Sequence, residues 1–388
     1  MPKPRVDSKA PDECCGCTAC ENICPKGAIT MLPDALGFLY PHIDEEKCID
    51  CGLCMKICAF RKNYARTAKF EQPLVYAARL RDDSQLARSQ SGGMGYALSA
   101  EAVNHNVIIY GVGFAEHFRA VHKRIDKVGG LEELRGSKYV QSDLRGIFQQ
   151  VKQDLKDGRQ VLFFGTPCQV SGLTSYIGEK LSEKLFTVDL VCHGCPSPAV
   201  WNAYLLHMER TGGGKIVEAR FRDKSYGWAS HYETFLFDSG KKKTAVTFRH
   251  LFYAHYILRP SCHNCPYTNL RRCSDLTIGD FWGWQKISNR FNDNRGVSLV
   301  LVNSEKGRAM LDEIRPVLEL VESNVRDCLQ PQLQAPTTPN PQRERFVRDF
   351  TQRGFLYVAR RYADLGWRWK MRASLSKAKR LIKKALGK

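Results

Sequence analysis

The chain has 388 residues, of which 43% are hydrophobic, 10% aromatic and 26% charged. These proportions are typical of a folded globular protein and exclude collagen, coiled coils and wholesale disorder. The formal net charge of +19 belongs largely to the C-terminal end, because residues 341–388 contain 15 lysines and arginines against three acidic residues. No apolar run approaches the roughly 18 residues of a membrane helix, and the polar N-terminal residues show no secretion signal. We therefore expect a cytoplasmic protein.

Sixteen cysteines are the most informative feature of the composition. Nine lie between Cys14 and Cys58, six lie between Cys168 and Cys273, and Cys328 stands alone. In a chain of this length without an export signal, thiols more often bind metal than form disulfides. The sequence therefore predicts metal centres in two regions of the chain.

Residues 14–24 and 48–58 each follow the spacing C-x2-C-x2-C-x3-C. In bacterial ferredoxins with this spacing, three cysteines hold one cluster and the fourth binds the other cluster. Zinc is the alternative, but a tetrahedral zinc site needs only four ligands, usually as two spaced pairs. We expect residues 1–65 to form an α+β, ferredoxin-like domain with two 4Fe-4S clusters. The expected ligands are Cys14, Cys17, Cys20 and Cys58 for one cluster, and Cys48, Cys51, Cys54 and Cys24 for the other. The neighbouring Cys15 can replace Cys14 in this assignment.

After a polar linker at residues 61–72, short apolar runs alternate with amphipathic stretches. This pattern predicts strands at residues 74–80, 107–114, 161–164 and 185–191. It predicts helices at residues 92–103, 144–155, 169–177 and 198–209. Such an alternation indicates an α/β domain with a mainly parallel sheet. Residues 216–248 look like antiparallel hairpins, so we expect the sheet to be mixed.

The cysteines of this larger domain gather at one edge of the predicted sheet. Cys168 and Cys192 each follow the C-terminal end of a predicted strand, and open α/β sheets bind ligands at that edge. A C-x2-C pair begins at residue 262, so a third four-thiolate site is expected. The candidates exceed the four ligands needed: Cys168, Cys192, Cys195, Cys262, Cys265 and Cys273. Any one of them can instead be a small buried hydrophobic residue.

A series of short motifs runs through this domain. In order they are Ser91-Gly92-Gly93, GSKYVQS at 136–142, GTPCQ at 165–169, CHG at 192–194, the pair Cys262 and Cys265, and GDFWG at 279–283. With these motifs in this order, the chain resembles the coenzyme F420 hydrogenase/dehydrogenase beta-subunit family. Within that family it is similar to the bacterial branch, which carries a fused two-cluster ferredoxin domain. The resemblance covers roughly residues 10–320.

The resemblance implies an FAD-containing iron–sulfur oxidoreductase, whose flavin-type domain with a mixed α/β sheet spans residues 73–325. It also implies a third cluster, held by Cys168, Cys192, Cys262 and Cys265. Cys273 is then a bystander or a substitute, and the fourth ligand stays open among Cys192, Cys195 and Cys273. Family members pass electrons to partners such as a deazaflavin or a tetrapyrrole, although the family name does not guarantee the deazaflavin in every branch.

FAD binding rests on the resemblance, because the chain has no G-x-G-x-x-G motif. Gly111-Val112-Gly113 lacks the third glycine and is interpreted as a turn at a strand end. The expected flavin contacts lie at the start of a predicted helix and in a polar loop: Ser91, Gly92, Gly93, Lys138, Tyr139, Gln141 and Ser142. A helix N-terminus attracts phosphate, although an ordinary capped turn and an exposed loop can have the same sequence.

Other polar residues give weaker signals. His193 stands between two cysteines, and we interpret it as a structural histidine rather than as an acid or a ligand. Arg222, Asp223 and Lys224 suit an anionic ligand and a solvated turn equally well. No catalytic residue is assigned from the sequence.

The C-terminal end changes character. Four prolines between residues 331 and 341 mark a linker, and residues 340–388 are expected to form a basic helical tail. In residues 371–386 an apolar stripe lies opposite lysines and arginines. Such a helix can lie on an anionic membrane, dock on an acidic partner or pack on its own domain. Nucleic acid is disfavoured as a partner, because no known binding module accompanies the charge.

Together these features predict a cytoplasmic, FAD-dependent iron–sulfur oxidoreductase, peripheral on the inner membrane face if the tail binds lipid. Electrons from ferredoxin or a redox partner subunit would pass through the N-terminal clusters, a third cluster and FAD to an unidentified small-molecule acceptor. The resemblance to the bacterial branch links that acceptor to surface-polysaccharide synthesis. One alternative is a non-catalytic electron-transfer subunit of a larger redox complex. Another is a structural metal protein with a basic binding tail.

Overall fold

A computed structural model describes residues 5–60 and 70–367, together with Trp369 and Met371. Eight strands form one mixed sheet in the order β13-β3-β12-β11-β7-β6-β4-β5. The parallel strands at its centre are β4 (Ile108–Phe114), β6 (Val161–Gly165), β7 (Leu185–Leu190) and β11 (Leu276–Asp280). Antiparallel pairs complete the sheet through β3 (Leu74–Leu80), β5 (Ala120–Ile125), β12 (Ser298–Val302) and β13 (Leu318–Ser323). The expectation of a mixed α/β sheet is confirmed.

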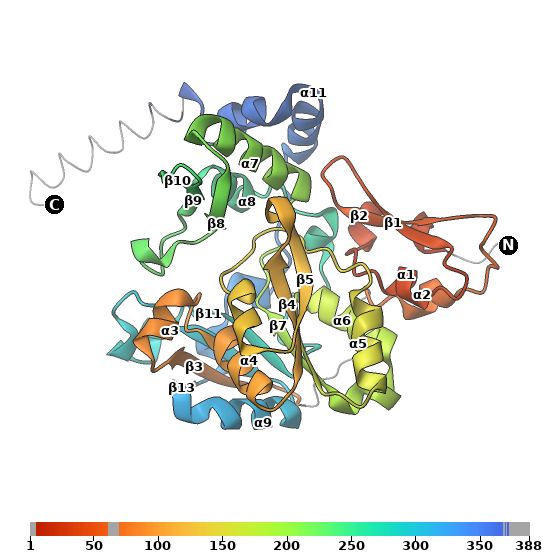
Figure 1. Cartoon of the computed structure of the whole chain (residues 1–388), viewed down its shortest axis with the longest axis vertical. Coiled ribbons are helices and arrows are strands. Elements are labelled where there is room, and N and C mark those ends of the chain that lie inside the picture. The colour runs from red at the N-terminus through yellow and green to blue at the C-terminus, as the bar shows by residue number, and fades with distance from the viewer. Residues whose placement is uncertain (1–4, 61–69, 368, 370, 372–388) are drawn as a thin grey trace, which may run out of the picture.

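Helices pack on both faces of this sheet (Figure 1). The face with Ile109 packs against α4 (Met94–Asn104) and α9 (Glu305–Ile314), and α3 (Asp83–Arg88) follows β3. The face with Tyr110 packs against α5 (Ile147–Lys156) and α6 (Pro167–Ile177). Successive strand residues point to opposite faces, so strands covered on both sides become continuous apolar runs. This explains why residues 161–164 are entirely apolar.

The predicted hairpins do not enter this sheet. They form a separate antiparallel sheet from β8 (Ile216–Arg220), β9 (Glu233–Phe237) and β10 (Lys242–Ala245). Its helices are α7 (Pro198–Gly212), α8 (Thr247–Tyr253) and α11 (Arg343–Tyr362). The second sheet has its own aromatic core, in which Trp201, Tyr204 and Phe235 are buried. The main sheet is therefore mixed because of its own antiparallel strands and not because of residues 216–248.

The N-terminal domain lies at one side of the molecule (Figure 1). Its elements are α1 (Ala19–Ile23), β1 (Ile29–Pro33), β2 (Leu39–Ile43) and α2 (Leu53–Ile57), and both helices contact α6. Several hydrogen bonds attach it to the larger domain, two of them near its C-terminal end. Ser175 Oγ on α6 donates to the carbonyl oxygen of Ile57 at 2.8 Å, and Tyr267 OH donates to that of Ala59 at 2.7 Å.

The described part of the C-terminal region packs on the larger domain. After α10 (Val325–Cys328), residues 330–340 lie against other elements instead of forming a free linker, and α11 contacts α7 and α8. The amphipathic helix expected at 371–386 lies outside the described residues except for Met371. Within the described ranges, none of the helices is long and apolar enough to cross a membrane.

Candidate cofactor sites

The two cysteine runs of the N-terminal domain have matching backbone conformations. Gly16 and Asp50, which precede the second cysteine of each run, have φ angles of 68° and 50°. Thr18 and Gly52, which follow that cysteine, have φ angles of 66° and 74°. Positive φ angles on both sides of a cysteine curl the backbone into a concave loop, and such loops present N–H groups to anions. The repeated spacing in the sequence thus corresponds to a repeated local structure.

The eight cysteines gather into the two predicted sets. Cys14, Cys17, Cys20 and Cys58 influence one another electrostatically, and we call them the inner set. Cys24, Cys48, Cys51 and Cys54 line one small cavity, and we call them the outer set. Each run therefore sends its fourth cysteine to the other set, as the ferredoxin spacing requires. Burial raises the pKa of the Cys14 and Cys20 thiols, whereas Cys51 is exposed.

A third group of thiols lies in the larger domain. Six cysteines line a second small cavity: Cys15, Cys168, Cys192, Cys195, Cys262 and Cys265. The structure thus brings together the four residues of the predicted third site and adds two more. Cys273 lies apart, because its thiol donates to the carbonyl oxygen of Pro167 at 3.1 Å. We call the six residues the third thiol set.

Cys15 and Cys195 have specific places in this set. The backbone N–H of Cys195 donates to the sulfur of Cys262 at 3.2 Å, and hydrogen bonds with Cys192 and Cys262 raise the pKa of the Cys195 thiol. The Cys15 thiol hydrogen-bonds with both Cys168 and Cys17, which raises its pKa. Cys15 therefore lies between the inner set and the third thiol set, a position that its spacing alone did not indicate.

Thiolate sets of this kind suit iron–sulfur clusters. Within the described ranges, no group of three or more His, Cys, Asp or Glu side chains converges on a point as ligands of a single metal ion do. In a four-iron cluster each thiolate binds a different iron, so the ligands surround a volume instead of a point. The donor chemistry and the two small cavities fit such a group.

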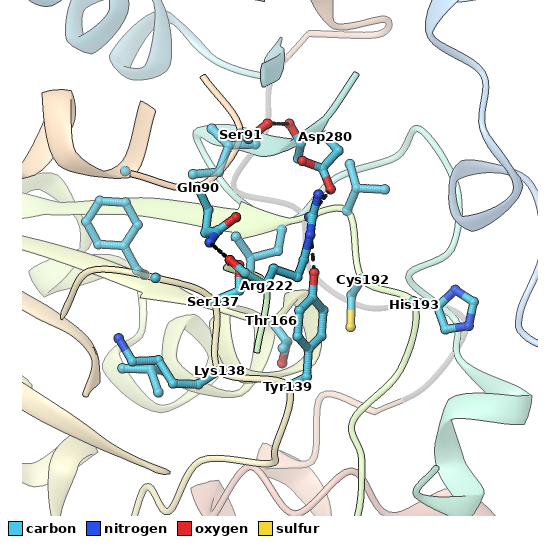
Figure 2. Close-up of a pocket in the computed structure, with 18 of the residues that line it drawn as sticks. Gln90, Ser91, Ser137, Lys138, Tyr139, Thr166, Cys192, His193, Arg222 and Asp280 are labelled. Atoms are coloured by element: carbon cyan, nitrogen blue, oxygen red, sulfur yellow. Dashed lines mark hydrogen bonds and ion pairs between the residues drawn. The ribbon is translucent and has the colours of Figure 1, made fainter. Parts of the chain in front are cut away.

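A larger cavity of about 690 Å³ lies at the carboxyl edge of the parallel strands (Figure 2). It is lined by the ends of β6 and β7, the start of α4, the loop 134–140 and the segment 192–196. This edge is where open α/β sheets bind ligands, and the volume lies in the range of cofactor sites. The cavity shares Cys192, His193, Gly194 and Cys195 with the cavity of the third thiol set.

The loop before α4 is held rigidly at this cavity. Lys224 Nζ donates to the carbonyl oxygens of Leu86, Ser89 and Ser91 at 2.7, 3.0 and 2.8 Å, which uses all three ammonium donors. Burial lowers the pKa of Lys224 to about 8. Ser91 and Gly93 line the cavity, whereas Gly92 does not. A Cβ on Gly92 would lie 2.0 Å from the carbonyl oxygen of Ala78, so packing explains this glycine.

Arg222 crosses the wall of the cavity between Tyr139 and Asp280 (Figure 2). It is 4% exposed, pairs with Asp280 and donates to Tyr139 OH at 3.3 Å. Its Nε is buried and has no hydrogen-bond partner. The segment 222–224 is therefore not a solvated turn. An orphaned, buried guanidinium N–H beside a cavity fits a ligand that supplies an acceptor.

The residues expected to contact flavin in the loop 138–142 lie in two different places, the large cavity and the interface with the N-terminal domain. Lys138, Tyr139 and Ser142 line the cavity, and burial lowers the pKa of Lys138 to about 7. Gln141 does not line it. Its amide donates to the carbonyl oxygen of Cys15 at 3.0 Å and accepts from Arg259. Gly111 and Val112 line the cavity from within β4, so the interpretation of 111–113 as a strand-end turn is wrong.

His193 takes part in a hydrogen-bond chain between the two cavities. Gln332 Nε2 donates to His193 Nδ1 at 2.8 Å, and Nε2 of His193 contacts Nε2 of His255 at 3.0 Å. His255 Nδ1 reaches the carbonyl oxygen of Thr338 at 2.9 Å, which requires a proton on that nitrogen. His193 must then donate through Nε2, and burial lowers its pKa to about 4. These contacts agree with a structural role.

The segment 330–338 was not expected at this site. Gln330 and Gln332 line the large cavity, and Thr337 Oγ1 donates to the carbonyl oxygen of His193 at 2.7 Å. The carbonyl oxygen of Thr337 also contacts His263 Nδ1 at 2.7 Å. Prolines in this segment indicated a linker, and no local pattern distinguishes a linker from a segment that crosses a site.

Comparisons with known proteins agree with this geometry. Residues 158–326 match the family model of the C-terminal part of the coenzyme F420 hydrogenase/dehydrogenase beta subunit, and residues 13–62 match a 4Fe-4S dicluster domain. One subunit of the F(420)H(2) dehydrogenase from Methanosarcina mazei is 21% identical over 325 residues, covering 80% of this chain and 85% of that protein. A chain of the F420-reducing NiFe hydrogenase complex from Methanosarcina barkeri aligns at 16% identity with a TM-score of 0.45. That alignment covers 74% of this chain and 89% of the other.

The fold and the thiol sets define an iron–sulfur electron-transfer protein with an oxidoreductase role. Residues 158–326 belong to the coenzyme F420 hydrogenase/dehydrogenase beta-subunit family, and residues 13–62 form a 4Fe-4S dicluster domain. The resemblance expected from the motifs is confirmed.

Proposed function

We propose that the chain is an iron–sulfur flavoprotein oxidoreductase that transfers electrons from the N-terminal domain to a small-molecule acceptor. The continuity of the sites carries this proposal. Cys15 joins the inner set to the third thiol set, and residues 192–195 line both the cavity of the third thiol set and the large cavity. The outer set contains the exposed Cys51, so electrons from ferredoxin or a partner subunit would enter there.

The third thiol set would hold a 4Fe-4S cluster through Cys168, Cys192, Cys262 and Cys265. Cys195 and Cys15 would then act as thiols near the cluster. Cys195 donates its backbone N–H to Cys262, which stabilises a thiolate at that position. Cys273 would be a buried bystander.

FAD is the cofactor that suits the large cavity. A flavin exchanges one electron with clusters and two with most organic substrates. Ser91 and Gly93 at the start of α4, together with Lys138, Tyr139 and Ser142, would hold it. The N–H groups at the start of α4 attract phosphate, and Lys224 fixes the carbonyl groups of the preceding loop on the other side. Arg222 Nε can donate to an acceptor atom of the bound molecule.

Quantifying iron, sulfide and flavin on one anaerobically purified sample tests the proposal. We expect about twelve irons, four for each cluster, and one FAD per chain. Cys265→Ala should lower the content to about eight irons, whereas the matched variant Cys273→Ala should retain about twelve. About eight irons and no flavin in the wild type would contradict both the third cluster and the FAD.

The identity of the electron acceptor distinguishes a free enzyme from a non-catalytic electron-transfer subunit. The relative from Methanosarcina mazei is one subunit of a dehydrogenase, which supports a partner subunit as electron donor or acceptor. A free enzyme would reduce its own substrate, and a sugar-related compound of surface-polysaccharide synthesis is the candidate from the family resemblance. Turnover by the isolated chain with a reduced dye and candidate acceptors separates this enzyme from a non-catalytic electron-transfer subunit.

We further propose a cytoplasmic location with contact to the anionic inner membrane surface. Arg345, Arg348 and Arg353 on α11 are exposed, and Trp367 beyond it is 65% exposed. Residues 372–388 add seven lysines and arginines and no acidic residue. Tryptophans and basic residues together favour the interface of anionic lipid. Sedimentation with phosphatidylglycerol vesicles should retain the full chain but not a chain ending at residue 371, and phosphatidylcholine vesicles should retain neither.

A further inference from the structure

Arg259 lies where the N-terminal domain meets the larger domain and is only 1% exposed. Its guanidinium donates to the carbonyl oxygens of Cys14 and Leu39 at 2.8 and 2.9 Å and to Gln141 Oε1 at 3.0 Å. These partners are neutral, and within the described ranges no carboxylate forms an ion pair with Arg259. A full positive charge therefore stays at this buried interface.

This charge faces the sulfur atoms of the inner set, and Arg259 also lines the cavity of the third thiol set. Arg259 Nη2 lies 3.7 Å from Cys14 Sγ. Burial raises the pKa of the Cys14 thiol, and the guanidinium acts in the opposite direction by stabilising the thiolate. The chain is shaped for this contact, because a Cβ on Gly16 would lie 2.8 Å from Arg259 Nη1. The guanidinium also lies over the ring of Tyr40, at 4.2 Å from its centroid.

The outer set has different surroundings. At the inner set a second cation, Lys9 Nζ, donates to Cys58 Sγ at 3.3 Å. At the outer set the donor to Cys24 Sγ is the neutral backbone N–H of Ala28, also at 3.3 Å. Arg5 and Lys26 line the cavity of this set, but carboxylates of Asp7 and Glu45 pair with Arg5, and Lys26 is exposed to water. A cluster becomes one unit more negative on reduction, so a nearby cation stabilises the reduced state and a low dielectric strengthens this effect. Burial alone would destabilise the more negative, reduced state at the inner set and so lower its reduction potential.

We propose that Arg259 is a positioning residue that raises the reduction potential at the inner set above that at the outer set. The inference rests on the proposed function, because it requires a cluster at both sets. One electron then passes from the outer cluster, which is oxidised, to the inner cluster, which is reduced, and no proton or bond changes place. This difference in potential directs electrons from the outer set to the inner set, which is the set next to the larger domain.

Anaerobic redox titration followed by electron paramagnetic resonance measures both potentials, and Cys20→Ala assigns the signal of the inner set. Arg259→Gln should lower the equilibrium constant for reducing the inner cluster at least tenfold, which is about 59 mV for one electron. The outer cluster should keep its potential. Arg259→Lys keeps the charge and should retain most of the wild-type reduction potential of the inner cluster. Ser175→Ala removes an uncharged hydrogen bond of the same interface and should leave both potentials unchanged.

Lys9→Gln provides a second test on a partly exposed residue whose loss does not threaten folding. This variant should lower the equilibrium constant for reducing the inner cluster by less than tenfold, because water screens the charge of Lys9. Equal shifts of both clusters, an unmoved inner potential, or a shift in Arg259→Lys as large as in Arg259→Gln would each overturn the inference. Iron and sulfide analysis separates the two proposals: missing clusters in the wild type contradict the proposed function, whereas intact clusters with unmoved potentials contradict only the role of Arg259.

Discussion

Lys224 illustrates how one side chain can shape the cavity without lining it. Its ammonium group binds one carbonyl oxygen in α3 and two in the loop before α4, so this loop cannot relax without leaving a buried cation partly unpaired. The proposed phosphate contacts at Ser91 and Gly93 depend on the shape of that loop. Lys224 is therefore a positioning residue for the cofactor site.

We expect Lys224→Met to raise the dissociation constant for FAD at least tenfold and to leave the iron content unchanged. Fluorescence titration of the flavin-depleted protein measures this constant. Lys241→Met removes an exposed lysine from the hairpin between β9 and β10 and should have no effect. Equal flavin affinity in both variants would exclude a role of Lys224 in shaping the loop.

His122 makes stability depend on pH. The ring is 4% exposed and lies flat against Phe163, and Nε2 contacts the carbonyl oxygen of Phe164 at 2.9 Å. Burial lowers the pKa of His122 to about 4, from about 6.5 in the unfolded chain. Between these values the unfolded chain binds a proton that the folded protein does not, so stability is lost as the pH falls through this window.

This lowering of the His122 pKa corresponds to about 3 kcal/mol in the free energy of unfolding. The contribution is present in full above pH ~6.5 and absent below pH ~4. Urea unfolding between these values should show a shallower pH dependence for His122→Asn than for the wild type. His105 is exposed on the surface, so His105→Asn should retain the wild-type slope. Parallel curves for the wild type and His122→Asn would show that His122 does not titrate as expected.

Among the helices and strands, those with strong periodic patterns were predictable. The expected strands at 74–80 and 161–164 and the helix at 169–177 agree with the structure within two or three residues, because burial of one or both faces dictates their apolar pattern. The separate sheet of β8, β9 and β10 could not be predicted. Its strands also carry a buried apolar face, and only the tertiary packing on α7 and α8 decides which sheet they join.

The residues of the sites also divide into those that local sequence predicts and those that depend on tertiary contacts. The ligand sets of the N-terminal domain follow from spacing, since cysteines three residues apart in one loop must face one another. The crossing segment 330–338 and the place of Arg259 depend on contacts between residues more than 100 positions apart, such as that of Arg259 with Cys14. No local pattern encodes such contacts.

α11 is an integral part of the second core. Phe346 is fully buried there and lies 5.3 Å from the ring of Tyr256. Phe346→Ala should lower the free energy of unfolding by about 3–5 kcal/mol, because it leaves a cavity in a well-packed core. Leu356→Ala, on the exposed side of the same helix, should change it by less than about 0.5 kcal/mol. Denaturant unfolding tests both, and equal stabilities would show that α11 is not part of the folded core.

The contact between the two domains leaves no spare volume. A Cβ on Gly172 of α6 would lie 2.7 Å from Cys17 Sγ of the inner set. Gly172→Ala should therefore cost about 1–3 kcal/mol of stability by overpacking. We also expect faster amide hydrogen exchange in residues 14–24 as the N-terminal domain separates from α6. Gly129→Ala meets no atom within 4 Å and should leave both measurements unchanged. Unchanged exchange in Gly172→Ala would show that the interface can adapt.

The closure of the third thiol set by residues 330–338 has a consequence for biosynthesis. Both sets of the N-terminal domain are complete once the ribosome has made the first 58 residues, so clusters can be inserted while the rest of the chain is still being translated. The third set lacks its crossing segment until Thr337 and Thr338 have emerged, about 280 residues later. Maturation with the proposed third cluster should thus proceed in two stages, with iron loaded first at the N-terminal end. An iron-starved cell would then accumulate chains with clusters in the N-terminal domain and none in the larger domain.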